Sequence, residues 1–131
     1  MTHWIFISST KQFRMHEWLN VNDCVEFVQR NKVQVNDIVY LYTTAPVKRI
    51  EYKMVVERIN VPYEEAIDDS AFSVVPSDVN KDDVYVRLRL IKKVDTPLLH
   101  LDFLREWGVR SSMQSPFTIS GKLLDYIDSK F

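Results

Sequence analysis

Few side chains in this sequence are spaced for catalysis or metal binding. The histidines are His3, His16 and His100. They show no metal-ligand spacing with one another or with Cys24, so the pattern does not indicate a zinc site. Gly108 and Gly121 are the only glycines, which excludes a glycine-rich phosphate loop and a dinucleotide fingerprint. We therefore expect no metal and no cofactor.

Carboxylate pairs and serines give little more support for an enzyme. Asp68-Asp69 and Asp82-Asp83 are adjacent acids within an acidic stretch, and such acids usually face solvent. No serine lies in a nucleophile-elbow pattern. The sequence leaves open a triad assembled from residues far apart in the chain. The expectation is a protein that is not an enzyme.

The charge is distributed unevenly, although the net charge is only −1. Residues 61–84 hold seven acids and one base, a net charge of −6, and the remaining residues have a net charge of +5. We interpret the acidic excursion as a solvated surface loop in preference to a ligand site. The mildly basic remainder permits contacts with phosphate groups without demanding them.

Length and composition are those of one folded domain covering residues 1–131. Hydrophobic residues make up 46% and charged residues 27%, as in ordinary globular proteins. No apolar run is long enough to span a bilayer, and the first residues lack the pattern of a signal peptide. A single cysteine suits a reducing compartment, so we expect a cytoplasmic protein without membrane contact.

Hydrophobic periodicity predicts several strands interrupted by helices. Alternating or apolar strand patterns cover residues 3–7, 38–43, 50–59 and 84–90. Helices are predicted over residues 11–19, before Gly108 and from an N-cap at Ser120. Residues 24–30 fit a helix or an extended segment equally well. The whole pattern predicts an α+β protein with a curved sheet or small barrel.

The longest alternating segment predicts which side chains face the core. Over residues 50–59, one face carries the apolar set Ile50, Tyr52, Met54 and Val56. The other face carries Glu51, Lys53, Val55 and Glu57, so we expect this face to be exposed to solvent. In the preceding strand, Ile38, Tyr40 and Tyr42 face one way and Val39, Leu41 and Thr43 face the other.

The most informative stretch reads VNDIVYLYTTAP over residues 35–46 and is followed by IEYKMVV over residues 50–56. Together with the WIF strand at residues 4–6, the Trp18 helix and MQSPFTI at residues 113–119, it resembles the EVE domain family. EVE domains belong to the PUA-like superfamily, which includes YTH and ASCH domains. The family usually has Gly-Asp where this chain has Asn36-Asp37, and asparagine tolerates positive φ.

The resemblance implies a PUA-like curved sheet or pseudo-β-barrel with flanking short helices. It also implies a pocket at one mouth that accepts a flipped, often modified, base from a nucleic-acid strand. Such a pocket needs aromatic faces for stacking and a few polar groups that read the base edge. The function expected from the resemblance is a nucleic-acid-binding module, with the choice between DNA and RNA left open.

Carried over from the family, the pocket rim consists of Ser8, Ser9, Trp18, Phe27, Tyr42, Thr43, Arg110, Gln114, Ser115 and Pro116. We expect Trp18 and Tyr42 to stack on the base. Ser9 and Gln114 would read its edge, Arg110 would hold a phosphate, and Phe27 would form a further wall. Each ring also has a purely structural interpretation, because buried tryptophan and tyrosine pack cores regardless of function. Trp4 and Trp107 are assigned to structure.

Two other functions stay open. A protein-interaction domain would use the acidic excursion at residues 61–84 to bind a basic partner. A small nucleoside-directed hydrolase or transferase would use the same pocket as the base-binding module. The sequence does not distinguish these by motif, and it does not indicate the modification, the partner or the oligomeric state.

Overall fold

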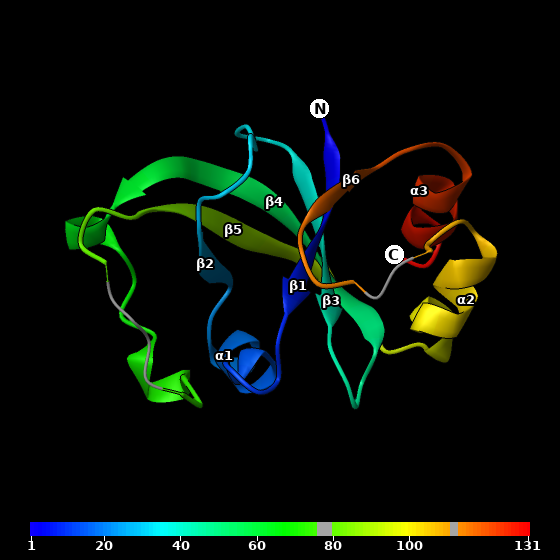
Figure 1. Cartoon of the computed structure of the whole chain (residues 1–131), viewed down its shortest axis with the longest axis horizontal. Helices are drawn as coiled ribbons and strands as arrows, with labels where there is room; N and C mark the ends of the chain where they lie inside the picture. Colours follow the sequence, from blue (N-terminus) through cyan, green and yellow to red (C-terminus); the bar gives the residue numbers. More distant parts are fainter. Residues whose placement is uncertain (76–79, 111–112) are drawn as a thin grey trace.

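The structure is a computed structural model, and it describes residues 1–75, 80–110 and 113–131. These residues form one curled mixed sheet of six strands with short helices around it (Figure 1). The strands are β1 (His3–Ser8), β2 (Cys24–Val28), β3 (Ile38–Thr43), β4 (Arg49–Pro62), β5 (Val84–Lys93) and β6 (Phe117–Ile119). Their order is β2-β5-β4-β3-β1-β6, with β1 and β3 parallel. The predicted α+β curved sheet is confirmed.

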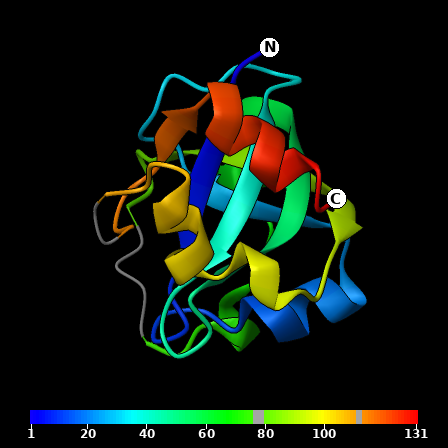
Figure 2. The ribbon, with the colours of Figure 1, turned by 90° about the vertical axis from the view of Figure 1, so that its right-hand side faces the viewer.

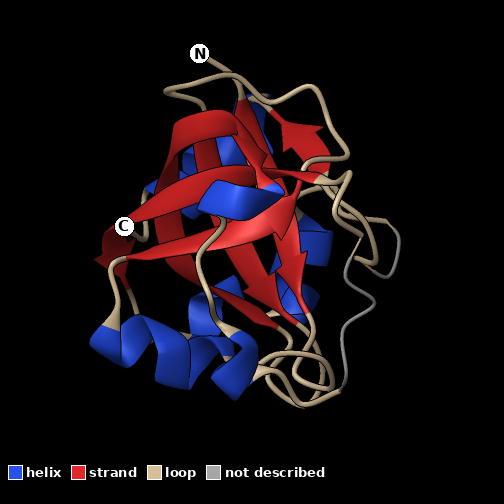
Figure 3. Ribbon diagram, turned by 90° about the vertical axis from the view of Figure 1, so that its left-hand side faces the viewer, coloured by secondary structure: helices blue, strands red, loops and turns tan. Residues whose placement is uncertain are grey.

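Helices cover one face of the sheet and one end of the curl. The α-helices are α1 (Met15–Val21), α2 (Leu101–Glu106) and α3 (Gly121–Asp128). Short 3-10 helices are η1 (Tyr63–Glu65), η2 (Ser70–Phe72) and η3 (Pro97–Leu99). Figure 2 shows α2 and α3 in front of the central strands, and Figure 3, from the opposite side, shows the curled strands toward the viewer. None of the helices in the described ranges has the length and apolarity that a bilayer-spanning segment needs.

Two hydrophobic clusters lie on opposite faces of the sheet. One fills the inside of the curl and includes Phe6, Trp18, Leu41, Met54 and Leu88. The other lies between the sheet and the helices α2 and α3, and it includes Ile5, Tyr40, Ile50, Leu104 and Ile127. All six residues of β3 are buried, because each face of this strand meets one of the two clusters. The predicted alternation along β3 is confirmed.

The expected alternation along β4 is wrong in one place. A register shift places Leu41 opposite Tyr52 but Tyr42 opposite Ile50, which leaves Glu51 as an extra residue, a β-bulge. Because a bulge reverses the faces of the residues beyond it, Ile50 packs with the α2–α3 cluster and not with Tyr52. The face of β4 that we predicted to be exposed to solvent is also partly covered, since Val55 packs against the α2–α3 cluster.

The turn before β3 joins the first strand to the rest of the sheet. Asn36 has a φ of 75°, so asparagine does adopt the left-handed conformation expected at this position. The Asp37 carboxylate, in a residue that is 3% exposed, accepts hydrogen bonds from the backbone N–H groups of Thr2 and Gln34, both at 2.9 Å. It also accepts one from the Trp4 indole N–H at 3.1 Å. This carboxylate therefore fixes β1 beside the start of β3.

Several helix and strand boundaries differ from the sequence-based prediction. The first helix begins at Met15 and not at residue 11, because the backbone N–H of Arg14 donates to Phe72 and not to a preceding turn. Residues 24–28 resolve as the strand β2, which pairs with β5. Gly108 follows α2 with a φ of 112° and confirms the predicted helix end. Ser120 is at the N-cap position of α3, although its side chain makes no capping hydrogen bond.

Candidate functional site

The curl of the sheet brings β1 and β2 together inside the barrel without hydrogen-bonding them to each other. The Phe6 and Phe27 rings meet edge to face at a centroid distance of 5.5 Å. Beside this contact lies a cavity of about 500 Å³, which we call the seam cavity. Its described lining includes Ile7, Ser8, Ser9, Gln12, Phe13, Met15, Val25, Glu26, Phe27, Val28, Asp69, Ser73, Val75, Asp83 and Tyr85.

A second depression of about 440 Å³, the outer groove, continues the seam cavity. It shares Ile7, Gln12, Phe27 and Val28 with the cavity. Its other lining residues are Phe6, Arg30, Asn31, Val33, Val86, Gln114, Ser115 and Pro116. The two depressions therefore form one continuous surface feature around Phe27.

The seam cavity has aromatic walls and a polar rim. Phe13, Phe27 and Tyr85 supply the rings, and Ser9 and Gln12 supply polar groups. The turn that carries this rim is closed by hydrogen bonds from the N–H groups of Gln12 and Phe13 to the carbonyl of Ser9, both at 3.1 Å. Rings and hydrogen-bonding groups around an open cavity are what a planar heterocyclic ligand requires.

The acidic segment from η1 to residue 75 forms one wall of the cavity. The N–H of Val74 donates to the carbonyl of Gln12 at 2.9 Å, and Phe13 and Ser73 form an isolated β-bridge. The Phe72 ring packs against Trp18 at a centroid distance of 5.1 Å. Our interpretation of residues 61–84 as a solvated loop is therefore wrong for this part, because the backbone and Phe72 dock onto the turn before α1. Residues 76–79 of the excursion lie outside the described residues.

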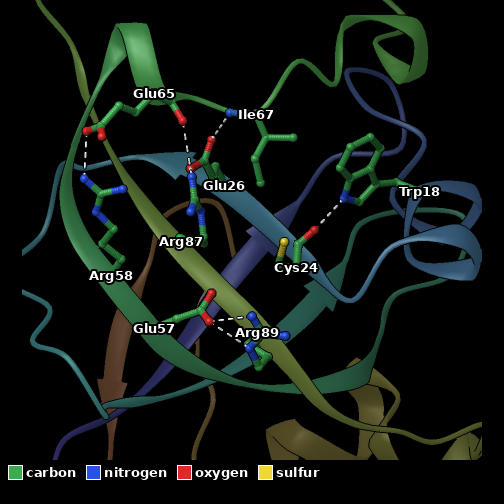
Figure 4. A network of polar contacts seen from close by, with 9 residues as sticks. All are labelled: Trp18, Cys24, Glu26, Glu57, Arg58, Glu65, Ile67, Arg87 and Arg89. Atoms are coloured by element: carbon green, nitrogen blue, oxygen red, sulfur yellow. Dashed lines mark hydrogen bonds and ion pairs between the residues drawn. The ribbon is translucent and has the colours of Figure 1, made fainter.

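Buried and surface ion pairs anchor the same segment to the sheet (Figure 4). The Glu26 carboxylate accepts hydrogen bonds from the Ile67 N–H at 2.6 Å and from the Arg87 guanidinium at 3.0 Å. Arg58 pairs with Glu65 at 2.7 Å, where both side chains are about half exposed. The buried acceptor Glu26 matters most, because removing a partner from a buried charge costs far more than breaking a surface pair.

The electrostatic character changes along the continuous feature. Glu26, Asp69 and Asp83 all line the seam cavity. Burial raises the pKa of Asp69, and the nearby charges of Glu26 and Asp68 raise it further. Burial likewise raises the pKa of Tyr85. The outer groove instead carries Arg30 with the neutral polar side chains of Asn31 and Gln114, so negative potential concentrates in the cavity.

The structure brings together most of the residues that the family resemblance places at the rim. Ser8, Ser9 and Phe27 line the seam cavity. Phe27 also lines the outer groove, together with Gln114, Ser115 and Pro116. Residues from the first strand, the β2 strand and the late loop therefore meet at one place.

The other predicted site residues lie elsewhere. The side chain of Trp18 is in the core, where the residue is 5% exposed and its indole N–H donates to the carbonyl of Cys24 at 2.7 Å. Tyr42 is 4% exposed and packs in the α2–α3 cluster, on the other face of the sheet from the cavity. Arg110 is exposed and is not among the described residues that line the seam cavity or the outer groove.

Thr43 lines a third cavity of about 400 Å³, which we call the rear pocket. Glu51, the bulged residue, is 8% exposed there, with its carboxylate 3.4 Å from the Thr43 hydroxyl. His16 Nδ1 and the Tyr52 hydroxyl are 2.9 Å apart. Burial, aided by the charges of Glu51 and Glu17, raises the pKa of Tyr52 to about 12, so this phenol stays protonated at neutral pH.

Sequence reasoning missed several lining residues. Gln12, Phe13 and Tyr85 belong to the cavity, and Arg30 belongs to the outer groove. Tyr85 lies directly opposite Val28 in the β2–β5 pair, so a correct strand assignment for residues 24–28 would have signalled it. The described residues contain no group of three or more His, Cys, Asp or Glu side chains placed to hold a metal ion.

Comparison with known proteins identifies the fold. No protein-family model matches the sequence, and no curated protein is significantly similar to it. Among solved structures, ASCH from Zymomonas mobilis superposes with a TM-score of 0.67 at 12% identity, covering 98% of this chain and 94% of that one. The fold is PUA-like, as in ASCH domains.

Two further solved structures share this fold. Atu2648 from Agrobacterium tumefaciens gives a TM-score of 0.67 at 14% identity, covering 99% of this chain and 93% of that one. Rpa0253 from Rhodopseudomonas palustris gives a TM-score of 0.62 at 10% identity, covering 99% and 92%. The PUA-like fold that the sequence resemblance implies is thereby confirmed. At such identities the likeness is one of fold alone.

Proposed function

We propose that this protein is a nucleic-acid-binding module that holds one extruded base in the seam cavity. The observation that carries the proposal is the aromatic-walled cavity at the open side of a PUA-like half-barrel, with Phe13, Phe27 and Tyr85 around it. We further propose, on the sequence of residues 35–46 and 50–56, that the chain belongs to the EVE branch of this fold. The single cysteine fits a reducing cytoplasm.

The size and chemistry of the cavity suit a base. Its volume of about 500 Å³ falls within the usual range of small-molecule sites. Stacking on an aromatic side chain contributes about 1–3 kcal/mol per base. Ser9 and Gln12 stand at the rim, where hydroxyl and amide groups can hydrogen-bond a base edge. Ile7 and Val28 add apolar surface, against which a methyl modification would gain about 0.8 kcal/mol on burial.

The outer groove supports a path for the nucleic-acid backbone. Phosphate groups would be repelled by the acids of the seam cavity and attracted by Arg30. Residues outside the acidic excursion carry a net charge of +5, which adds a diffuse attraction. Such binding weakens as salt rises, because phosphate contacts release counterions.

Binding is tested with two variants that spare the core. Gln12→Ala removes an exposed side chain common to both depressions, and the lost hydrogen bond should lower affinity about fivefold. Arg30→Ala should weaken binding of all sequences and reduce the slope of log K against log salt by about 1. The measurement is fluorescence anisotropy with single- and double-stranded oligonucleotides, carrying unmodified or modified bases, at two salt concentrations.

Lys122→Ala provides the matched charge control, because Lys122 is exposed on α3, away from the depressions. Affinity for oligonucleotides should be unchanged in this variant apart from a small general charge effect. If Arg30→Ala and Lys122→Ala lose affinity equally, the binding is a nonspecific attraction between phosphate groups and positive charge. Unchanged affinity in both Gln12→Ala and Arg30→Ala would contradict the site.

The rear pocket favours a second candidate, a nucleoside-directed enzyme. A buried carboxylate next to a hydroxyl, as in Glu51 and Thr43, is an arrangement in which the carboxylate can act as a general base. Incubating the protein with a panel of nucleosides and following product by chromatography tests this candidate. Turnover that Glu51→Gln abolishes would support the enzyme, and absence of turnover would leave binding as the function.

A further inference from the structure

We infer that the seam cavity selects guanine, with the Asp69 carboxylate accepting hydrogen bonds from the N1–H and N2–H₂ groups of the base. This inference rests on the proposed function and adds the base that the cavity takes. It starts from the carboxylates around the cavity, which differ in whether the protein itself already donates hydrogen bonds to them.

Asp69 has unused acceptor capacity at the cavity wall. It lines the cavity with Phe13, Phe27 and Tyr85, just before η2. Within the described residues, no other residue donates a hydrogen bond to its carboxylate, and its oxygens are not sealed from solvent. A half-buried carboxylate to which no other residue donates can accept hydrogen bonds from a ligand that supplies donors.

Two nearby carboxylates are already engaged, those of Glu26, which lines the cavity, and Asp68. Glu26 accepts from Arg87 and from the Ile67 N–H, so its charge is paired. Asp68 accepts from the N–H and hydroxyl of Ser70, at 3.2 and 2.7 Å. Asp83 lines the cavity as well and adds negative potential. This leaves Asp69 and Asp83 open to a ligand, and we place the base on Asp69 because burial desolvates its carboxylate. The same burial raises the pKa of this carboxyl.

The chemistry of the bases then decides which one fits. A carboxylate presents two acceptor oxygens and no donor. Guanine presents two N–H donors side by side on its Watson–Crick edge, so it can bond both oxygens. Adenine and cytosine place a ring-nitrogen acceptor beside their amino group, and uracil flanks its N3–H with two carbonyl oxygens. Each of these other bases would place a lone pair against the carboxylate.

The surrounding groups support a base and exclude its phosphate. Aromatic walls stack on the ring system, while Glu26, Asp69 and Asp83 repel anions. The phosphates remain in the outer groove with Arg30. A guanine base in the acidic seam cavity and its phosphate beside Arg30 in the outer groove would thus match the charge of each depression.

The experiment measures affinity for single-stranded oligonucleotides that differ at one central base, which is guanine, hypoxanthine, adenine, cytosine or uracil. Hypoxanthine is the sharpest comparison because it differs from guanine only by the missing amino group. We expect the wild-type protein to bind the guanine oligonucleotide about tenfold more tightly than the hypoxanthine one. Asp69→Asn should remove most of this preference, and Glu64→Gln, an equal charge change at an exposed residue of the same segment, should keep it.

The outcomes separate this inference from the proposed function. Binding without preference between guanine and hypoxanthine overturns the guanine assignment and leaves a base-binding module standing. A preference that survives in folded Asp69→Asn overturns the role of Asp69. Binding of none of the oligonucleotides overturns the proposed function and this inference together. If Asp69→Asn fails to fold, the wild-type comparison of guanine with hypoxanthine still decides the guanine assignment.

Discussion

Replacing Asp37 with alanine is expected to lower the free energy of unfolding by about 3–4 kcal/mol. The Asp37 carboxylate is buried and accepts three hydrogen bonds, from Thr2, Trp4 and Gln34. Each donor would lose its partner, and hydrogen bonds to a charged group contribute about 1.5–3 kcal/mol before non-additivity is considered. Since domains are stable by only about 5–15 kcal/mol, this loss would leave the fold marginal.

Urea denaturation followed by circular dichroism measures the effect. Asp125→Ala is the matched control, because Asp125 is exposed on α3, and we expect a change within about 0.5 kcal/mol. An equal loss in the two variants would show that Asp37 does not hold β1 to β3. Asp37→Asn should fall between wild type and alanine, since the amide keeps one acceptor oxygen.

The same carboxylate should make stability depend on pH. Burial alone would raise the pKa of Asp37, but the hydrogen bonds from Thr2, Gln34 and Trp4 outweigh it and hold the pKa below its usual range. Because the pKa of Asp37 is lower in the folded state, its ionised carboxylate stabilises the protein at pH values above the unfolded-state pKa of about 3.9. This stabilisation is lost as the pH falls from that value toward the lower pKa of the folded state. The difference in Tm between wild type and Asp37→Asn should therefore be constant above about pH 5 and shrink toward pH 3. A difference that grows on acidification would contradict the assignment.

Trp18→Ala is the second substitution with a large expected effect, a loss of about 3–5 kcal/mol in the free energy of unfolding. The indole is buried, contacts Phe13 and Phe72 edge-on, and donates to the carbonyl of Cys24. Its removal leaves a large void and an unsatisfied carbonyl. Because Phe72 lies in the segment whose residues Asp69 and Ser73 line the seam cavity, this wall should loosen as well.

Trp107→Ala is the matched control for Trp18. Trp107 is 42% exposed and stacks on Tyr126 at a centroid distance of 4.8 Å, a contact that contributes about 0.5–1.5 kcal/mol. Thermal unfolding of the two variants should differ by several degrees. Oligonucleotide affinity is then measured at a temperature at which Trp18→Ala remains folded. A stable Trp18→Ala variant with no binding would restore Trp18 as a stacking face and contradict its core role.

The fold could be predicted from sequence where the pattern is local. Alternation in β3 and β5 follows from side chains that pack on fixed faces of the sheet, and Asn36 and Gly108 mark positions of positive φ. The bulge at Glu51 could not be predicted, because the sequence around Glu51 carries no local pattern that marks a bulge. The register shift depends instead on how β4 pairs with β3. The docking of the acidic segment was missed for a related reason, since composition reports charge and not backbone pairing.

The candidate site was predictable only in part. Ser8, Phe27 and Gln114 meet because strand order and curl bring distant segments together, and the family resemblance carried that information. The resemblance could not decide whether Trp18 faces a ligand or the core, because an amphipathic helix buries a tryptophan in either case. Gln12 and Tyr85 enter the cavity through the turn before α1 and the β2–β5 pairing, which no short motif encodes.

The position of β1 between β3 and the edge strand β6 has a consequence for biosynthesis. β1 pairs in parallel with β3 and in antiparallel fashion with β6, so that residues 3–5 lie beside residues 117–119. On the ribosome, β1 emerges before the other strands, and its second neighbour emerges after all of them. Until then, the backbone of Trp4 and Ile5 offers an unpaired strand edge, which is a template for aggregation. This edge of β1 is therefore covered only once β6 has emerged and paired with it.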